Sequence, residues 1–321
     1  MKRRIAVAAA AAAGIAACLF VLAGLHWRTR PTAAAAAPPP TATKPAATQP
    51  PLPAGAVAFA TTHYTILSSA TPAQTSRVAD AVEALHAAYA GVFREVSEAG
   101  EAKLQLVLYH DRREFKAHNR SSPWAEAYYL RPRCHAYYAD GTANPYHWML
   151  HEATHQLNAQ VAHFPRRKWI DEGLASYFGA SRLEGGRLLP GSIDADAYPI
   201  WWLPDLALGG DAQADIRAGR FIALRDLVGG TGSDIARHVN LYYVEYWSLA
   251  HFLFHYRDGR YAEAYRRLIL AGGSLQDFER LIGPVDRVQD EWHDYLRARS
   301  DEARRTRRRV EWIAAPSGQS R

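Results

Sequence analysis

The spacing of apolar residues divides the chain into an N-terminal part with strand patterns and a longer helical remainder. Residues 72–96 repeat apolar positions at helical spacing, and Thr71 followed by Pro72 is a typical helix start. A short helix is expected over 111–119. Three segments rich in β-forming residues predict strands, at 63–69, 103–110 and 134–141. Strands that alternate with helices in this way predict a small mixed sheet.

The rest of the chain has mainly helical spacing. Helices are predicted over 145–160 and 166–180, and a loop rich in Gly, Pro and Trp over 185–220. A long aromatic loop is expected to be either a lid over a site or a packed surface loop. Further helices are predicted at 221–229, 240–257, 260–271, 274–282 and 285–299. A small mixed sheet followed by a mostly helical part predicts an α+β fold for one domain over 57–300.

Residues 1–30 have the pattern of an export or anchoring segment. Three basic residues precede an uncharged apolar run from Ile5 to Leu25, which is long enough to span a bilayer and longer than the apolar core of most cleaved signals. We expect a single-pass anchor in a bacterial inner membrane with the domain on the periplasmic side. A secreted protein after signal cleavage and a lipoprotein modified at Cys18 are the alternatives. Cys134 has no partner for a disulfide within the domain, which suits a bacterial envelope.

Charge is distributed unevenly along the chain. The net charge of +6 comes from 38 basic and 32 acidic residues. Residues 31–56, rich in Pro, Ala and Thr, predict an extended linker. Residues 1–56 hold six basic and no acidic residues and 301–321 hold six and three, which leaves 26 basic and 29 acidic residues for 57–300. Nucleic-acid binding is therefore not expected of the domain. The basic tail, 301–321, is expected to be a solvated end, with contact to anionic lipid as the alternative.

The strongest candidate for chemistry is the segment HEATH at 151–155. Positions four apart lie on one face of a helix, so His151 and His155 present two imidazoles to one point, as a zinc ion requires. Glu152 lies beside the first of them, where it can take a proton from a zinc-bound water and pass it to a leaving amine. Because the chain has 14 histidines, two histidines that merely cap a neighbouring turn are the alternative.

A catalytic zinc site needs a third protein ligand, and the segment WIDEG supplies one. Glu172 lies on the next predicted helix, and Pro165 lets the two helices turn back on each other. Gly173 is expected to let their backbones approach closely. Asp171 can accept a hydrogen bond from a ligand imidazole and so fix its tautomer. As an alternative, Asp171 and Glu172 are an acidic pair on a surface helix.

The segments HEATHQL and WIDEGLASYF resemble the gluzincin metallopeptidases, a superfamily of thermolysin-like and aminopeptidase N-like enzymes. They are most similar to the compact peptidase MA-like domains of many bacterial proteins. The resemblance is specific at 151–176 and covers about 57–300. It implies Glu152 as the general base, and Asp171 matches an Asn that supports a ligand in thermolysin-like enzymes. It also implies three zinc ligands, His151, His155 and Glu172.

The other common zinc pattern does not fit this chain. The metzincin motif needs glycine at 158 and histidine at 161, where the chain has Asn158 and Val161. His163 comes two residues too late and is expected to be a loop residue or one that supports the site from outside.

Aminopeptidase N relatives place a tyrosine at the start of a later helix, ten residues before a buried leucine, and the segment from Tyr243 to Leu253 is similar. The resemblance implies that Tyr243 stabilises the oxyanion, although Tyr242, Tyr243 and Tyr246 also fit plain helix packing. Residues 134–141 lack the Gly-x-Met-Glu-Asn sequence that captures a free amine, so an endopeptidase is favoured over an aminopeptidase. This strand is expected to pair with an extended peptide at the sheet edge.

Together these patterns predict a membrane-tethered zinc metallopeptidase that acts on peptide or protein substrates. Two alternatives keep the zinc: a catalytically idle, partner-binding module, and a hydrolase of non-peptide amides such as cell-wall cross-links. Glu152 favours a catalyst, because an idle site has no use for a base there. An inert pair of helical histidines is the alternative without a metal.

Overall fold

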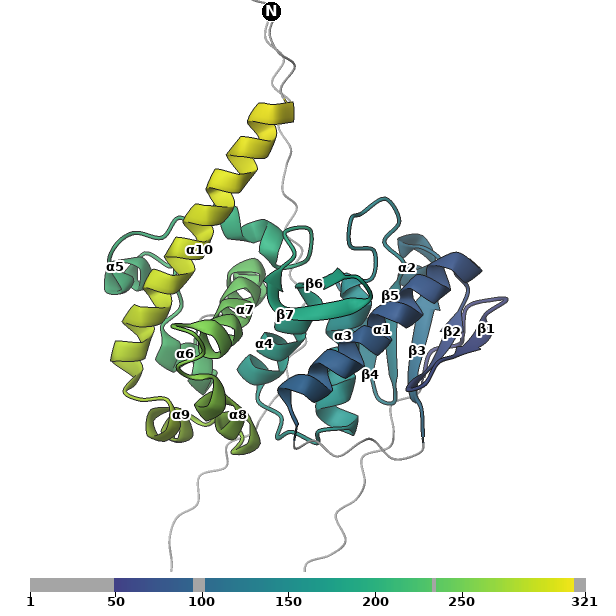
Figure 1. Ribbon diagram of the computed structural model, residues 1–321, viewed down its shortest axis with the longest axis horizontal. Coiled ribbons are helices and arrows are strands. Elements are labelled where there is room, and N and C mark those ends of the chain that lie inside the picture. Colours follow the sequence, from purple (N-terminus) through teal and green to yellow (C-terminus); the bar gives the residue numbers. More distant parts are fainter. Residues whose placement is uncertain (1–48, 95–101, 233–234, 315–321) are drawn as a thin grey trace, which may run out of the picture. The chain divides into compact units, whose positions relative to one another are not determined.

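A five-stranded mixed sheet lies beside a set of helices (Figure 1). The computed structural model describes residues 49–94, 102–232 and 235–314. The central strands β2, β3 and β5 run parallel, and the outer strands β1 and β4 run antiparallel to their neighbours. The spatial order is β1 (Val57–Ala60), β2 (Tyr64–Ser68), β3 (Leu104–Tyr109), β5 (Arg133–Tyr137) and β4 (Ala127–Leu130). The predicted α+β fold is confirmed.

Helices cover the sheet and form the C-terminal part. In Figure 1, α1 and α3 lie against the sheet, and α10 is the long helix that extends past the other C-terminal helices. The helices are α1 (Pro72–Val92), α2 (Arg112–His118), α3 (His147–Gln160), α4 (Lys168–Gly179), α5 (Ala212–Arg217), α6 (Leu224–Gly229), α7 (Val239–His255), α8 (Ala262–Leu270), α9 (Leu275–Leu281) and α10 (Val285–Ala314). Two short 3-10 helices are η1 (Ile200–Asp205) and η2 (Ile235–Arg237).

The alternation of side chains along β3 gives the sheet two apolar faces. Leu104, Leu106 and Leu108 are buried in the main core, which the helices α1 and α3 share. Val107 and Tyr109 point to the opposite face and pack with Phe115 of α2 in a second, smaller cluster. Because successive side chains of a strand point to opposite faces, one continuous apolar strand serves both clusters.

The helix α1 begins where the sequence predicts. The Thr71 hydroxyl accepts a hydrogen bond from the Gln74 amide at 3.3 Å, and the Gln74 side chain accepts one from the Thr71 amide at 3.0 Å. This reciprocal pair is a capping box, which satisfies two backbone donors at the helix start. The helix ends at Val92, earlier than predicted, and residues 95–101 lie outside the described part.

The strand β4 corrects the expectation that 134–141 forms the sheet edge. β5 is paired on both sides, with β3 and with β4, so it has no free edge for a peptide. β4 takes the outer position instead. The sequence contains a signal for it, because two runs of β-forming residues flank Arg131 and Pro132, as in a hairpin.

The prediction of a loop over 185–220 is wrong for most of its length. Residues Arg187–Ile193 form β7, which pairs with β6 (Ser181–Glu184) across a turn at Gly185 and Gly186. The helices η1 and α5 follow it. Paired glycines between two strand-like segments are a hairpin signal, because both residues have positive φ.

The helix α10 corrects the predicted end of the last helix at residue 299, because it continues to Ala314. The start of the described part also contacts the domain. Pro50 and Pro53, from the segment with linker composition, are buried. The Gln49 side-chain amide donates to the carbonyl oxygens of Leu130 and Arg131 at 3.1 and 3.0 Å.

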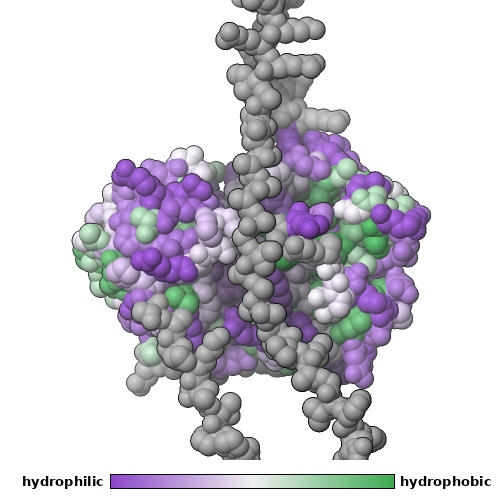
Figure 2. Space-filling view, turned by 180° about the vertical axis from the view of Figure 1, so that it is seen from behind, coloured by the Kyte–Doolittle hydropathy of each residue, from purple (hydrophilic) through white to green (hydrophobic). Residues whose placement is uncertain are grey.

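None of the helices in the described ranges is long and apolar enough to cross a membrane. The expected anchor, residues 5–25, lies outside these ranges. Figure 2 views the molecule from behind the view of Figure 1. On this face the described surface is mostly hydrophilic, and the apolar residues lie in separate patches.

Two glycines of α4 allow close helix packing, and they correct the role expected of Gly173. A Cβ atom at Gly173 would lie 3.0 Å from the Tyr246 carbonyl oxygen of α7, so this glycine serves the contact between α4 and α7. The close contact between α3 and α4 is at Gly179, where a Cβ atom would lie 3.3 Å from the backbone nitrogen of His151. Both contacts are with backbone, which cannot rotate away.

We expect Gly173→Ala to lower the free energy of unfolding by about 1–3 kcal/mol, because α4 and α7 must separate to admit the methyl group. Gly91→Ala is the matched control. Gly91 is also helical, but nothing lies within 4 Å of its added Cβ atom, so the higher helix propensity of alanine should leave stability equal or raise it by up to about 1 kcal/mol. Urea unfolding of both variants tests this. Equal effects of the two substitutions would contradict the close contact.

Candidate metal centre

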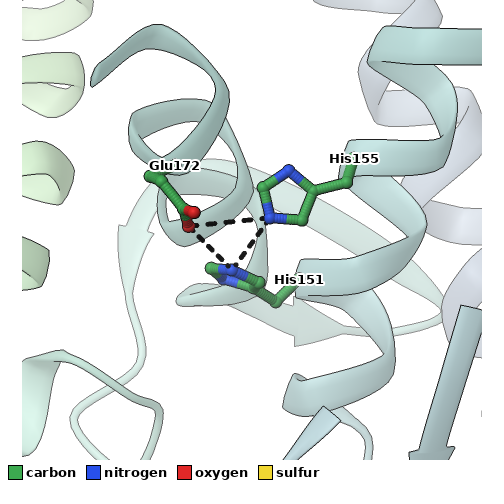
Figure 3. Close-up of side chains that lie close together, drawn as sticks. All are labelled: His151, His155 and Glu172. Carbon is green, nitrogen blue, oxygen red and sulfur yellow. Dashed lines mark hydrogen bonds and ion pairs between the residues drawn. The ribbon is translucent and has the colours of Figure 1, made fainter. Parts of the chain in front are cut away.

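Two helices bring three side chains of kinds that can ligate a metal to one point. His151 and His155 lie one turn apart on α3, and Glu172 of the neighbouring α4 points at both (Figure 3). The two Nε2 atoms are 3.3 Å apart, and Glu172 Oε2 lies 3.5 Å from Nε2 of His151 and 3.6 Å from Nε2 of His155. The ligand atoms of all three residues lie within 4.8 Å of one another, so the cluster can hold a metal ion.

The core fixes the helix that carries both histidines. Met149, Leu150, Ala153 and Leu157 of α3 are fully buried in the main core. These positions lie on the helix face that packs on the sheet and α1, which turns the histidines towards α4. The connection from α3 to α4 reverses the chain, and His163 within it has a φ of 50°.

Buried carboxylates favour a positive charge at this point. Burial disfavours the charged imidazole of His155, yet Asp171 and Glu172 outweigh that cost and hold its pKa well above the ordinary value. Burial raises the pKa of the Glu172 carboxyl group. The hydrogen bonds to the imidazoles of His151 and His155 outweigh this effect, so the pKa lies below its ordinary value. A metal ion can take the place of the proton as the compensating positive charge.

A chain of polar contacts connects the site to α1. Asp171 Oδ1 lies 3.1 Å from Nδ1 of His155 and accepts a hydrogen bond from the Asn158 amide at 2.9 Å. Asn158 Oδ1 in turn accepts one from the hydroxyl of the buried Tyr89 at 2.8 Å. With Nδ1 of His155 directed at Asp171, its Nε2 atom is left for a metal. The position of Asp171 is the one that the sequence predicts, whereas the contacts of Asn158 and Tyr89 were not predicted.

Glu152 lies beside the ligands and is almost fully buried, with 8% of its surface exposed. Burial raises the pKa of its carboxyl group, and the two imidazoles of His155 and His151 only partly oppose this. Its backbone is fixed from the sheet side, because the Cys134 thiol on β5 donates to the Glu152 carbonyl oxygen at 3.1 Å. Glu152 is among the residues that line the cleft described below.

The three metal-binding side chains line a cleft with a volume of about 460 Å³. Residues of β4 form part of its wall. Tyr243 at the start of α7 lines it too, with its ring centroid 6.2 Å from that of His151. Burial, with the negative charge of Glu172, raises the pKa of Tyr243 well above the ordinary value, so its hydroxyl keeps its proton. Tyr242 and Tyr246 are not among the lining residues. The structure therefore places Tyr243, of these three tyrosines, at the cleft.

Sequence reasoning missed several lining residues. Tyr198 precedes η1 and reaches the cleft from the segment expected to be a loop, and Trp148 precedes the HEATH segment on α3. Trp124 lies just before β4. The aromatic composition of 185–220 was the available signal for Tyr198, but it did not say which ring faces the site.

Comparison with known proteins gives a match to one family model over part of the chain and no activity. A family model described as a protein of unknown function (DUF1570) matches residues 148–269. The match includes the metal-binding cluster and Tyr243. No curated protein matches the chain.

We expect His155→Asn to lower the affinity for the metal by more than about 100-fold. Loss of a residue that only supports a ligand costs up to about 100-fold, and His155 is expected to contact the metal itself. His163→Asn is the matched control, because His163 is an exposed histidine near the site and asparagine tolerates its positive φ. Isothermal titration with Zn²⁺ measures both. Equal affinity of wild type and His155→Asn would show that the cluster does not bind the metal.

Asp171 should tune the affinity without binding the metal. We expect Asp171→Ala to lower metal affinity about 10–100-fold, because His155 loses the partner that orients its ring. Asp171→Asn keeps an acceptor oxygen but loses the charge, so it should fall between wild type and Asp171→Ala. The same titration measures this series. A full-affinity Asp171→Ala variant would contradict the supporting role.

Proposed function

We propose that this protein is a zinc-dependent metallopeptidase of the gluzincin type that hydrolyses peptide bonds. The observation that supports it best is the spacing of the three ligand atoms, 3.3 to 3.6 Å. In a tetrahedral zinc site with bonds of about 2.0–2.1 Å, neighbouring ligand atoms are about 3.3–3.4 Å apart. Two imidazoles and one carboxylate are also a common ligand set of catalytic zinc, and they leave one position open.

When bound, zinc would polarise the scissile carbonyl and acidify water. The protein's own base for this reaction is Glu152. Its carboxylate would accept a proton from the attacking water and return it to the leaving amine. Burial suits both steps, because a carboxyl group with a raised pKa gives up a proton less readily to bulk water and holds it until the amine leaves.

Tyr243 is the proposed stabiliser of the oxyanion. Its hydroxyl remains protonated because its pKa is raised, so it can donate a hydrogen bond to a developing negative charge in the cleft. Its position at the start of α7, close to His151, supports this role.

The edge strand β4 supports a peptide as the substrate. Three of its residues, Ala127, Tyr128 and Tyr129, line the cleft, and β4 is the last strand on its side of the sheet. An extended chain can add to such an edge through backbone hydrogen bonds, which are independent of side-chain identity. An edge of this kind favours cleavage within a chain over removal of a terminal residue.

We further propose that residues 5–25 tether the domain to the periplasmic face of a bacterial inner membrane, with the predicted linker, which begins at residue 31, as the spacer. This rests on the sequence pattern of these residues alone. The net charge of about −3 over 57–300 argues against nucleic acid as a partner.

The test compares the full chain as wild type and as Glu152→Gln. Glutamine has nearly the shape of glutamate but cannot take up the proton, so we expect at least about a 100-fold loss of cleavage with unchanged zinc content. Elemental analysis measures the metal, and casein with a mixed peptide library measures cleavage. Tyr243→Phe should retain zinc and lose about 10–1000-fold in rate.

The possible outcomes separate the alternatives. Zinc in both proteins without cleavage by either would contradict the peptidase and favour a binding module or a hydrolase of cell-wall amides. Purified peptidoglycan as a third substrate distinguishes those two. Absence of zinc from wild type would contradict the metal site itself.

A further inference from the structure

One side of the cleft is a row of aromatic rings, of which only Tyr243 has a role in the proposed reaction. Tyr243, Tyr198 and Trp148 all line the cleft. The ring centroids of Tyr243 and Tyr198 are 5.3 Å apart, and those of Tyr198 and Trp148 are 5.5 Å apart. Because Tyr243 also contacts His151, the row leads outwards from the metal-binding cluster.

Another tryptophan lines the cleft from a different segment. Trp124, just before β4, is 66% exposed although it is one of the largest apolar side chains of the protein. Leaving such a ring in water forgoes most of the free energy that its burial would contribute. Trp124 therefore adds a large exposed apolar surface to the wall of the cleft.

We propose that Trp148 and Tyr198 form a subsite that binds a bulky apolar side chain of the substrate, with preference for an aromatic ring. This rests on the proposed function. The rings are tilted to one another, by 33° between Trp148 and Tyr198 and by 54° between Tyr198 and Tyr243, so the wall that they form is not flat. A wall of tilted rings offers a ligand ring both faces and edges, and aromatic pairs favour offset-stacked and edge-to-face contacts.

Trp201 of η1 supports this subsite from behind. It does not line the cleft, but its ring centroid lies 5.6 Å from that of Tyr198 and 6.1 Å from that of Trp148. Its neighbour Trp202 is equally exposed but makes no ring contact with other residues of the described ranges. Trp201 therefore contacts both rings of the subsite at once.

The helix α10 holds the segment that carries these rings. Arg307 donates to the Trp201 carbonyl oxygen at 2.9 Å and to Asp205 Oδ1 at 2.7 Å. Arg304 donates to the Leu206 carbonyl oxygen at 2.7 Å. Pro204, inside η1, has no backbone N–H to donate to the Trp201 carbonyl three residues earlier, so this carbonyl accepts from Arg307 instead. Arg307 is therefore a positioning residue for the subsite.

Dipeptide hydroxamates that share one metal-binding group test the proposal on the zinc-loaded full chain. They carry phenylalanine, leucine or glycine, varied in turn at the first and second residue, and calorimetry gives their affinities. We expect wild type to bind the phenylalanine compound at least about tenfold more tightly than the glycine compound. In Tyr198→Ala this ratio should fall to about threefold or less, while Tyr198→Phe should retain it.

Two matched pairs of variants test whether Trp201 and Arg307 position the rings of the subsite. Trp201→Ala and Arg307→Ala should reduce the ratio about threefold or more, whereas Trp202→Ala and Arg305→Ala should leave it unchanged. Arg305 is an exposed arginine on the same turn of α10. Thermal unfolding midpoints of all variants show whether each remains folded. Equal reductions within a pair would contradict the positioning role.

The ratio of affinities reports the subsite, and the affinity common to all compounds reports the metal. If all the hydroxamates bind weakly but the phenylalanine compound still binds about tenfold more tightly than the glycine compound, the zinc site is contradicted and the subsite is supported. No preference in wild type, or the same preference in Tyr198→Ala, would overturn the subsite. Tighter binding of an amino-sugar disaccharide, lost in Tyr198→Ala, would overturn it in favour of a glycan.

Discussion

The burial of three carboxyl groups in one cleft is the constraint on which the rest of the site depends. Glu152, Asp171 and Glu172 are held close together and largely out of water, where like charges repel most strongly. Two imidazoles offset part of this cost, and a bound cation would offset more. The protein must hold these groups together against their repulsion. Close helix packing does so, with Gly179 against the backbone of His151, and so does the hydrogen bond from Asn158 to Asp171.

The sheet explains why these helices lie where they do. The apolar face of α3 packs on the sheet and beside α1, so His151 and His155, on another face of the helix, point towards Glu172 of α4. The Tyr89 hydroxyl reaches from α1 to Asn158, and the Cys134 thiol reaches from β5 to the backbone of Glu152. Elements on two sides of α3 thereby fix the orientation of the site. A metal site needs this, because a small rotation of α3 would move both imidazoles together.

The metal-binding cluster could be predicted from the sequence because its geometry is mostly local. His151 and His155 are a helical pair, and Glu172 follows on the next helix of a short reversal. The order of helices and the α+β fold follow from apolar spacing in the same way. The outer strand β4 was missed, because pairing between strands is a long-range property that four residues do not reveal. The helix partner of Gly173 was also mistaken, since the sequence shows that a backbone approaches but not which one.

The aromatic side of the cleft could not be predicted from local sequence patterns, because it depends on contacts between distant segments. Tyr198 and Trp201 belong to a stretch with little regular structure, so their positions depend on what lies around them. The donors that hold this stretch, Arg304 and Arg307, are about 100 residues away, in a run that composition alone assigns to a solvated tail. Such arginines gain little from charge pairing at the surface. Their hydrogen bonds to backbone carbonyl groups have a different effect, because those groups lack partners within their own segment. Arg304 and Arg307 are thus part of the domain, and they hold the segment around Trp201 in place.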